Sequence, residues 1–140
     1  MKFILATQKD FEQFLPIKKD FFNDYNISEK SRDFILREFE EYILKGAIVL
    51  AIENKEIVGY LAGEIENNPY ERFGYVSEIF VKREYRGKGV STKLKDRFLE
   101  FLKERKITLC RIEVNPDNPA QEAYKKWGFK IDKYRMSLKF

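Results

Sequence analysis

The chain has 140 residues, of which 44% are hydrophobic and 36% charged, and its formal net charge at pH 7 is +4. Length and composition suit a single domain spanning residues 1–140 with one hydrophobic core, and they argue against disorder. One cysteine and no histidine exclude an internal disulfide and histidine-dependent hydrolases, and they leave almost no ligands for zinc, so we expect no metal.

Lysine and arginine alternate with glutamate along the sequence, which argues against a nucleic-acid partner. The first ten residues contain only a very short apolar run, unlike a secretion signal. No apolar stretch approaches the length that crosses a membrane. We therefore expect a cytoplasmic protein without a membrane partner.

The first half of the sequence predicts a strand, two helices and a β-hairpin. A short strand at 2–7 precedes a helix at 8–25, which we expect Pro16 to interrupt. Ser28 is the expected cap of a second helix over 31–44, which Gly46 ends.

The hairpin strands, 47–54 and 56–67, meet at a turn around Lys55. After a loop at 67–74, residues 75–82 predict a further strand.

The second half predicts an amphipathic helix at 89–105. Its buried face carries five residues at helical spacing, namely Val90, Leu94, Phe98, Phe101 and Leu102. A strand at 107–114 follows, and then a short helix with Asn118 as N-cap, Pro119 at its first position and Gln121 completing a capping box.

We expect Gly128 to stop this short helix, and one or two strands to finish the chain at 129–140. The whole order predicts a mixed α/β sheet, mostly antiparallel. Its one right-handed parallel crossover joins strands 75–82 and 107–114.

The turn between strand 75–82 and the long helix, in "VKREYRGKGVSTKL", places Gly87 and Gly89 among basic residues. Free N–H groups and the positive end of the helix dipole at such a turn form an anion site. The spacing matches neither a P-loop nor a dinucleotide fingerprint. A strand-to-helix turn without function is the alternative reading of this stretch alone.

"RGKGVS" followed by a helix resembles the pyrophosphate-binding loop of the GNAT superfamily of N-acetyltransferases, [QR]-x-x-G-x-[GA]. Arg86 and Gly89 match, whereas Ser91 stands where Gly or Ala is usual. "IEVNPDNPAQEAYKKWGF" resembles the family's second motif, with matches at Val114, Asn118, Ala120, Tyr124, Gly128 and Phe129. The resemblance covers essentially the whole chain in order.

The resemblance implies a GNAT-like fold, with a splay between the fourth and fifth strands that admits acetyl-CoA as cosubstrate. Backbone N–H groups would hold the pyrophosphate, contributed by Arg86, Gly87, Lys88, Gly89, Val90 and Ser91. Ile79, Phe80 and Val81 would bind the pantetheine arm, with Asn118 touching it or only capping its helix. Dimers are common in the family, so a homodimer is compatible with the sequence.

The implied reaction is direct transfer of acetyl to a primary amine in a ternary complex, with Tyr124 as general acid. Glu113 and Glu78 are the two candidates for general base, acting directly or through water. The alternative for Tyr124 is a packing role at the edge of the core, and the alternative for each carboxylate is an ion pair with a nearby basic residue. A CoA-binding regulatory domain without catalysis is the alternative function, and the sequence does not identify the amine.

Overall fold

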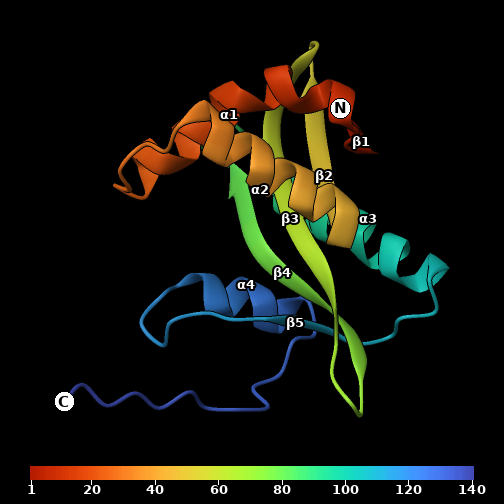
Figure 1. The fold of residues 1–140 in the computed structure, drawn as a ribbon, viewed down its shortest axis with the longest axis vertical. Coiled ribbons are helices and arrows are strands. Elements are labelled where there is room, and N and C mark those ends of the chain that lie inside the picture. The colour runs from red at the N-terminus through yellow and green to blue at the C-terminus, as the bar shows by residue number, and fades with distance from the viewer.

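The computed structural model describes residues 1–140 and folds them into a five-stranded sheet with helices on both faces (Figure 1). The elements in chain order are β1 (Lys2–Leu5), the 3-10 helix η1 (Gln8–Asp10), α1 (Phe11–Asp24), α2 (Arg32–Lys45), β2 (Gly46–Glu53), β3 (Glu56–Asn67), β4 (Arg72–Val81), the 3-10 helix η2 (Arg83–Tyr85), α3 (Val90–Glu104), β5 (Cys110–Ile112) and α4 (Ala120–Lys126).

The strands lie in the order β1-β2-β3-β4-β5, so each strand is beside its neighbours in sequence. The first four are antiparallel to one another, and only β4 and β5 run parallel. α3 connects these two, because parallel neighbours need a crossover. The predicted mixed sheet with one parallel crossover is therefore confirmed.

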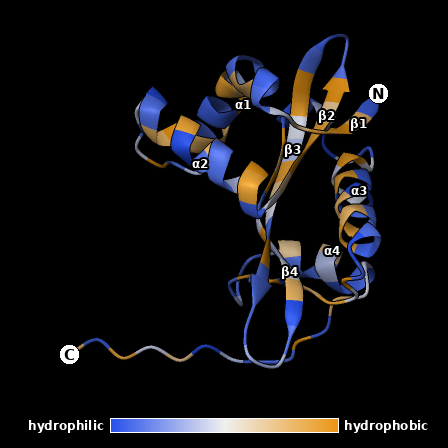
Figure 2. Ribbon diagram, turned by 45° about the vertical axis from the view of Figure 1, so that its right-hand side comes forward, coloured by the Kyte–Doolittle hydropathy of each residue, from blue (hydrophilic) through white to orange (hydrophobic).

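Each face of the sheet has its own apolar cluster. α3 covers one face, and α1 with α2 covers the other, as Figure 2 shows. The buried residues of α3 are the five that helical spacing predicts, Val90, Leu94, Phe98, Phe101 and Leu102. Gly63 in β3 lets α3 lie close to the sheet, because a Cβ there would be 2.3 Å from the ring of Phe98.

Two local predictions in the N-terminal half are wrong. α1 continues through Pro16, because Phe14 and Ile17 are both buried beside it and their packing outweighs the lost backbone hydrogen bond. Ser31 caps α2 in place of Ser28, since its hydroxyl accepts from the N–H of Phe34 at 3.2 Å. Gly46 follows the last residue of α2, as predicted.

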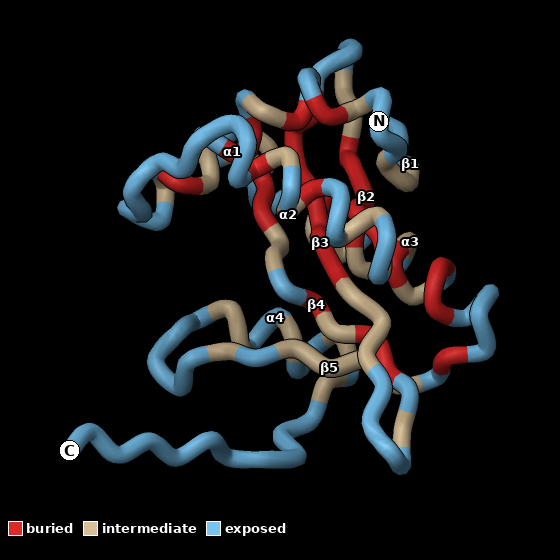
Figure 3. The backbone as a smooth tube through the Cα atoms, in the orientation of Figure 1, coloured by how far each residue is buried: buried red, intermediate tan, exposed pale blue.

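The C-terminal prediction of one or two strands is also wrong. Residues 129–140 are in no helix or strand, and β5 has only three residues. Beyond the half-buried Phe129, residues 130–140 lead away from the sheet and are exposed (Figure 3). An alternating pattern makes a strand only where another strand supplies hydrogen bonds, and here none does. No helix of the protein combines the length and apolar character needed to cross a membrane.

Candidate active site

β4 contains one extra residue at the point where it leaves β5. Its pairing with β3 shifts between Val76 and Glu78, so that Ser77 has no partner and forms a bulge. The bulge exchanges the two faces of the strand. Val76 lies in the cluster under α3, whereas Glu78 and Phe80 face α1 and α2.

β4 and β5 separate at this same point. The last pair between them is Val76 with Ile112, while β4 continues to Val81 paired only with β3. The expected splay between the fourth and fifth strands is therefore present. Ile79, Phe80 and Val81 lie in this stretch, and the backbone groups on its open side have no strand partner.

The loop that follows β4 presents a row of six successive backbone N–H groups, from residue 87 to residue 92. None of the six has an acceptor within the chain. Gly87 and Gly89 have φ angles of 73° and 79°, in the left-handed region that other residues rarely adopt. A Cβ on either glycine would meet nothing within 4 Å. The row lies at the positive end of the α3 dipole, so this is an arrangement that binds anions.

The row contains the predicted Gly87, Lys88, Gly89, Val90 and Ser91, and it adds Thr92. The N–H of Arg86 is outside it, because it donates to the carbonyl of Arg83 at 3.2 Å.

Arg86 ties the loop to the end of α1. Its guanidinium donates from Nη2 to Asp24 and from Nε to the carbonyl of Val81, both at 2.8 Å. Arg83 donates to the same carboxylate at 2.8 Å. Hydrogen bonds from Arg86 and then Arg83 hold the pKa of Asp24 below its ordinary value. Arg86 therefore fixes the position of the loop relative to α1 and the end of β4.

Two lysines beside the N–H row have no carboxylate partner. Lys88 lies over the ring of Tyr85 at 5.6 Å, and Lys93 lies over the ring of Phe3 at 5.8 Å. These are the basic side chains of the loop that are available to an anion, because Lys82, Arg83 and Arg86 are all in ion pairs.

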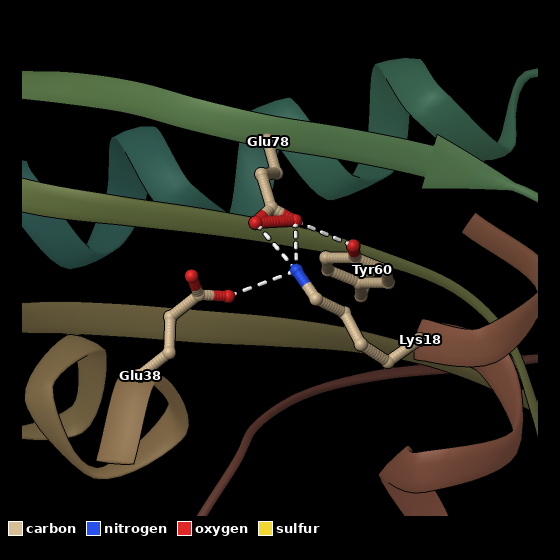
Figure 4. Close-up of polar contacts among 4 residues, drawn as sticks. All are labelled: Lys18, Glu38, Tyr60 and Glu78. Atoms are coloured by element: carbon tan, nitrogen blue, oxygen red, sulfur yellow. Dashed lines mark hydrogen bonds and ion pairs between the residues drawn. The ribbon is translucent and has the colours of Figure 1, made fainter. Parts of the chain in front are cut away.

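Glu78, one of the two predicted bases, lies in a partly buried polar cluster with Lys18, Glu38 and Tyr60 (Figure 4). Lys18, which is only 2% exposed, donates to both oxygens of Glu78 at 2.6 and 2.7 Å and to Glu38 at 2.9 Å. The hydroxyl of Tyr60 donates to Glu78 at 2.6 Å. Burial, and then the charge of Glu78, raise the pKa of Tyr60 well above its ordinary value. The cluster thus holds two carboxylates against one ammonium.

Glu113, the other predicted base, follows the last β4–β5 pair at the opening of the splay. Its carboxylate accepts from Arg135 at 2.9 Å and is more than half exposed. It also lies beside Tyr75, whose pKa is raised by burial first and by Glu113 second. The two predicted bases therefore flank the same opening in different environments, Glu78 half-buried beside Lys18 and Glu113 at the surface.

Tyr124 is on α4, which is fixed to the start of α3. The indole N–H of Trp127 donates to the hydroxyl of Thr92 at 3.1 Å. The ring of Tyr124 lies 5.4 Å from that of Trp127 and 6.4 Å from that of Phe129. Burial raises the pKa of Tyr124, and the phenol of Tyr25 adds to the effect. The Trp127–Thr92 bond brings the helix of Tyr124 to the loop that carries the N–H row.

The predicted start of α4 is wrong by one residue, because the N-cap is Pro119 and the helix begins at Ala120. Asn118 lies just before the N-cap, and its side-chain oxygen accepts from the N–H of Ala120 at 2.9 Å. The predicted capping box is wrong. Gln121 donates instead to the carbonyl of Pro116, since Pro119 turns the chain before the helix begins at Ala120. Gly128 ends α4 with φ of 98°.

The comparisons with known proteins bear on this arrangement of loop, splay and α4. The model of the acetyltransferase (GNAT) family matches residues 11–129. The chain belongs to the GNAT family of acetyltransferases. An uncharacterised N-acetyltransferase of Methanocaldococcus jannaschii is 26% identical over 132 residues, which cover 89% of this chain. The chain spans only 58% of that relative's length.

Two solved structures share the fold at lower identity. A predicted acetyltransferase from Clostridium acetobutylicum, solved with acetyl-CoA, is 23% identical with a TM-score of 0.82, covering 99% of this chain and 95% of its own. A ribosomal-protein-alanine N-acetyltransferase from Brucella melitensis biovar Abortus 2308 is 19% identical with a TM-score of 0.81, covering both chains fully. The GNAT-like fold is therefore shown for this chain.

One hollow of the molecule lies away from the splay. A hollow of about 350 Å³ lies between the end of α2 and the far end of α3, lined by Lys45, Arg72, Phe101 and Arg105 among others. The 15 residues of α3 separate it from the N–H row by roughly 20 Å, at about 1.5 Å per residue. The family's loop and splay are thus distinct from this hollow.

Sequence reasoning missed Lys18, Glu38 and Tyr60. A signal was available for Lys18, which lies at helical spacing between the buried residues Phe14 and Phe22. A lysine at a buried position requires a carboxylate partner. Glu38 and Tyr60 come from α2 and β3, so their meeting with Lys18 depends on the tertiary fold.

Proposed function

We propose that this protein transfers the acetyl group of acetyl-CoA to a primary amine, by direct attack of the amine in a ternary complex. The single observation that carries the proposal is the row of six N–H groups without acceptors, at the end of a strand whose next neighbour has separated from it. The row supplies donors for a pyrophosphate. The open side of β4 from Ser77 to Val81 supplies backbone groups for an extended amide-containing arm.

The chemistry follows from the groups around the splay. The amine nitrogen attacks the thioester carbonyl, and the C–S bond breaks as the tetrahedral intermediate collapses. The departing thiolate takes the proton of the Tyr124 phenol, which is protonated at neutral pH because its ordinary pKa is about 10 and burial raises the pKa further. A base removes the proton that the attacking nitrogen carries, and solvent restores both groups.

The need for a base depends on the amine. A lysine-like amine with a pKa near 10.4 costs about 4–5 kcal/mol to deprotonate at pH 7, and an α-amine costs about 1 kcal/mol. We assign the base to Glu113, because its carboxylate is more than half exposed at the opening of the splay. We assign Glu78 to acceptor binding, since its cluster with Lys18 and Glu38 retains a net negative charge beside the site.

One observation favours the alternative of a CoA-binding regulatory domain without catalysis. Both candidate bases are already in ion pairs, Glu78 with Lys18 and Glu113 with Arg135. The Arg135 pair lies at the surface, where such pairs contribute little and open readily. We therefore prefer the enzyme, and turnover of an amine separates the two functions.

Titration with acetyl-CoA tests the proposed loop. We expect acetyl-CoA to raise the melting temperature, and NAD and ATP to raise it much less. Gly89→Glu should weaken acetyl-CoA binding by about 100-fold or more, equivalent to about 2.7 kcal/mol, because it places a carboxylate against the pyrophosphate.

Gly89→Ala is the matched control, because it has the same backbone strain without the charge. It should retain most of the affinity. Normal binding by the Gly89→Glu variant would show that the N–H row is not the pyrophosphate site.

A further inference from the structure

The β3–β4 hairpin extends beyond the ends of α2 and α3, and the hollow of about 350 Å³ lies on its α3 face, where α3 no longer covers it (Figure 1). Gly74 of β4 faces α3, because a Cβ on it would be 2.3 Å from the side chain of Leu102. Side chains alternate along a strand and paired residues share a face, so Ile65, Asn67 and Arg72 also point to this face. The hollow is therefore the part of this face that the sheet leaves open past the helix.

The hollow has apolar walls and a basic rim. Its nine lining residues include three basic ones and no acidic one, although the chain as a whole has 23 acidic residues against 27 basic ones. Glu64 and Glu66 do not reach it, because the alternation along β3 turns them to the opposite face. The apolar walls come from Ile43, Leu44, Ile65 and Phe101.

Arg105 is held in one position at the rim. The Cζ of its guanidinium lies 3.7 Å from the ring centroid of Phe101, and Nη1 donates to the carbonyl of Phe101 at 2.9 Å. Glu104 is 3.8 Å away at the surface, where such a pair contributes little. A guanidinium that is already stacked on a ring loses less freedom when it binds a carboxylate.

Arg72 is the second anchor of the rim. It is exposed and has no ion-pair partner, since Glu71, its neighbour in sequence, is paired with Arg111 at 2.8 Å. Its guanidinium is therefore available to a carboxylate, which arginine binds through two parallel hydrogen bonds.

The ordinary explanation of a basic rim accounts for two of its three members. A lysine or arginine in the last turn of a helix, or just after it, offsets the helix dipole, and this suffices for Lys45 and for Arg105 taken singly. Lys45 is also paired with Glu41 at 2.6 Å. The dipole does not explain an unpaired arginine on a strand beside the same hollow, so Arg72 is the residue that points to a ligand.

We propose that this hollow binds a small organic carboxylate with an apolar body. Its charge would lie between Arg72 and Arg105, and its body against Leu44 and Ile65. The volume is at the lower end of the roughly 300–1,000 Å³ of small-molecule sites. A single negative charge fits better than two, because α2 and α3 both end here and turn the negative ends of their dipoles toward the site. The site is at the opposite end of α3 from the N–H row and does not overlap it.

Backbone amide chemical shifts of the full chain, measured by NMR during titration with phenylpropionate, test the proposal. The shifts should saturate with a dissociation constant of about 1 mM or below. They should be largest at residues 44–46, 65–67 and 101–105, and absent at residues 87–92. Phenylpropionamide lacks the charge and acetate lacks the apolar body, so each should bind at least about 10-fold more weakly.

Matched substitutions separate the rim from net charge. Arg72→Gln and Arg105→Gln should each weaken phenylpropionate binding by about 10-fold or more, because each removes a charge-assisted pair of hydrogen bonds. Both arginines are exposed, so neither change removes a core side chain. Lys103→Gln is the control. It removes a positive charge from the same last turn of α3, but Lys103 does not line the hollow, so binding should be unchanged.

Three results would overturn the proposal. The first is the absence of saturable phenylpropionate binding, or shifts at residues 87–92 in place of those around the hollow. The second is equal weakening by Lys103→Gln, which would show that only net charge matters. The third is tighter binding of phenyl phosphate than of phenylpropionate, which would contradict a site for a single charge. Each of these results leaves acetyl transfer untouched, because turnover of an amine measures that function separately.

Discussion

Tyr124 is the residue for which local environment and proposed role agree most closely. Its phenol is half-buried against Trp127 and Phe129, and it is protonated at neutral pH because its ordinary pKa is about 10 and burial raises the pKa further. It therefore carries a proton that it can donate to a thiolate. We predict that Tyr124→Phe lowers kcat by about 100-fold or more and leaves acetyl-CoA affinity within a few-fold. Steady-state kinetics and a binding titration measure the two effects. An unchanged kcat, with the chemical step limiting, would return Tyr124 to a packing role.

Matched amide substitutions distinguish the roles of the two carboxylates at the splay, Glu113 and Glu78. Glu113→Gln keeps the size of the side chain but cannot take a proton, so kcat/KM for the amine should fall at neutral pH. Raising the pH should recover much of this loss, because more of the amine is then neutral. Glu78→Gln should instead mainly raise the KM for the amine. The pH–rate profiles of both variants check this assignment.

A pH-dependent loss confined to Glu78→Gln would move the base to Glu78. If neither variant shows such a loss, the proton leaves through water, or the amine is acidic enough to need no protein base.

Lys18 is predicted to matter for stability. Lys18 is 2% exposed and forms ion pairs with both Glu78 and Glu38, so Lys18→Met would leave two carboxylates partly buried without their partner. The free energy of unfolding should fall by about 3–5 kcal/mol, the usual effect of removing one member of a buried ion pair. Urea denaturation measures it.

Lys19 is the matched control for this measurement. It is the next residue, more than half exposed, and 3.6 Å from Glu29. Lys19→Met should change stability by less than about 0.5 kcal/mol. Equal losses in the two variants would mean that the buried pair makes no special contribution.

Among the elements, the contact between α1 and the phosphate-binding loop depends on Asp24. Arg86 and Arg83 lower its pKa in the folded state, so the contact stabilises the fold above the unfolded pKa of about 3.8 and is lost as the pH falls through the lower folded value. Asp24→Asn should therefore be less stable than the unmodified protein at pH 7. The gap should close as the pH falls below 3.8.

Thermal unfolding between pH 7 and pH 2 tests this expectation. Asp20→Asn is the control, because Asp20 lies one turn earlier on α1 with its nearest basic group, Lys82, at 3.8 Å. A gap for Asp24→Asn that is constant with pH would show that the two arginines do not act through the charge of this carboxylate.

The sequence predicts those elements whose signal lies within a few consecutive residues. The apolar stripe of α3 has helical period over 15 residues, and Gly87 and Gly89 mark the turn before it. The bulge at Ser77 has no such signal, because an extra residue exists only relative to the register of β3. The predicted interruption at Pro16 was wrong for a related reason. The packing of α1 on the sheet, and not the local sequence, determines that the helix continues through this residue.

Across the whole molecule, the sheet divides the candidate site into two sides with different proposed roles. α3 and its N–H row are on one side, while α1 and α2 with the cluster of Lys18 and Glu78 are on the other (Figure 2). The splay connects the two sides where β4 leaves β5. We infer that acetyl-CoA enters from the α3 side and that the amine approaches from the α1 and α2 side.

Turnover of acetyl-CoA with a panel of amines tests the central claim most directly. The panel should include peptide N-termini, polyamines, amino acids and aminoglycosides, with free CoA and acetylated amine both measured. We predict equal amounts of the two products, formed only when a suitable amine is present. Tight binding of acetyl-CoA without acetylation of any amine, or release of CoA that does not depend on the amine, would contradict acetyl transfer as the function of this protein.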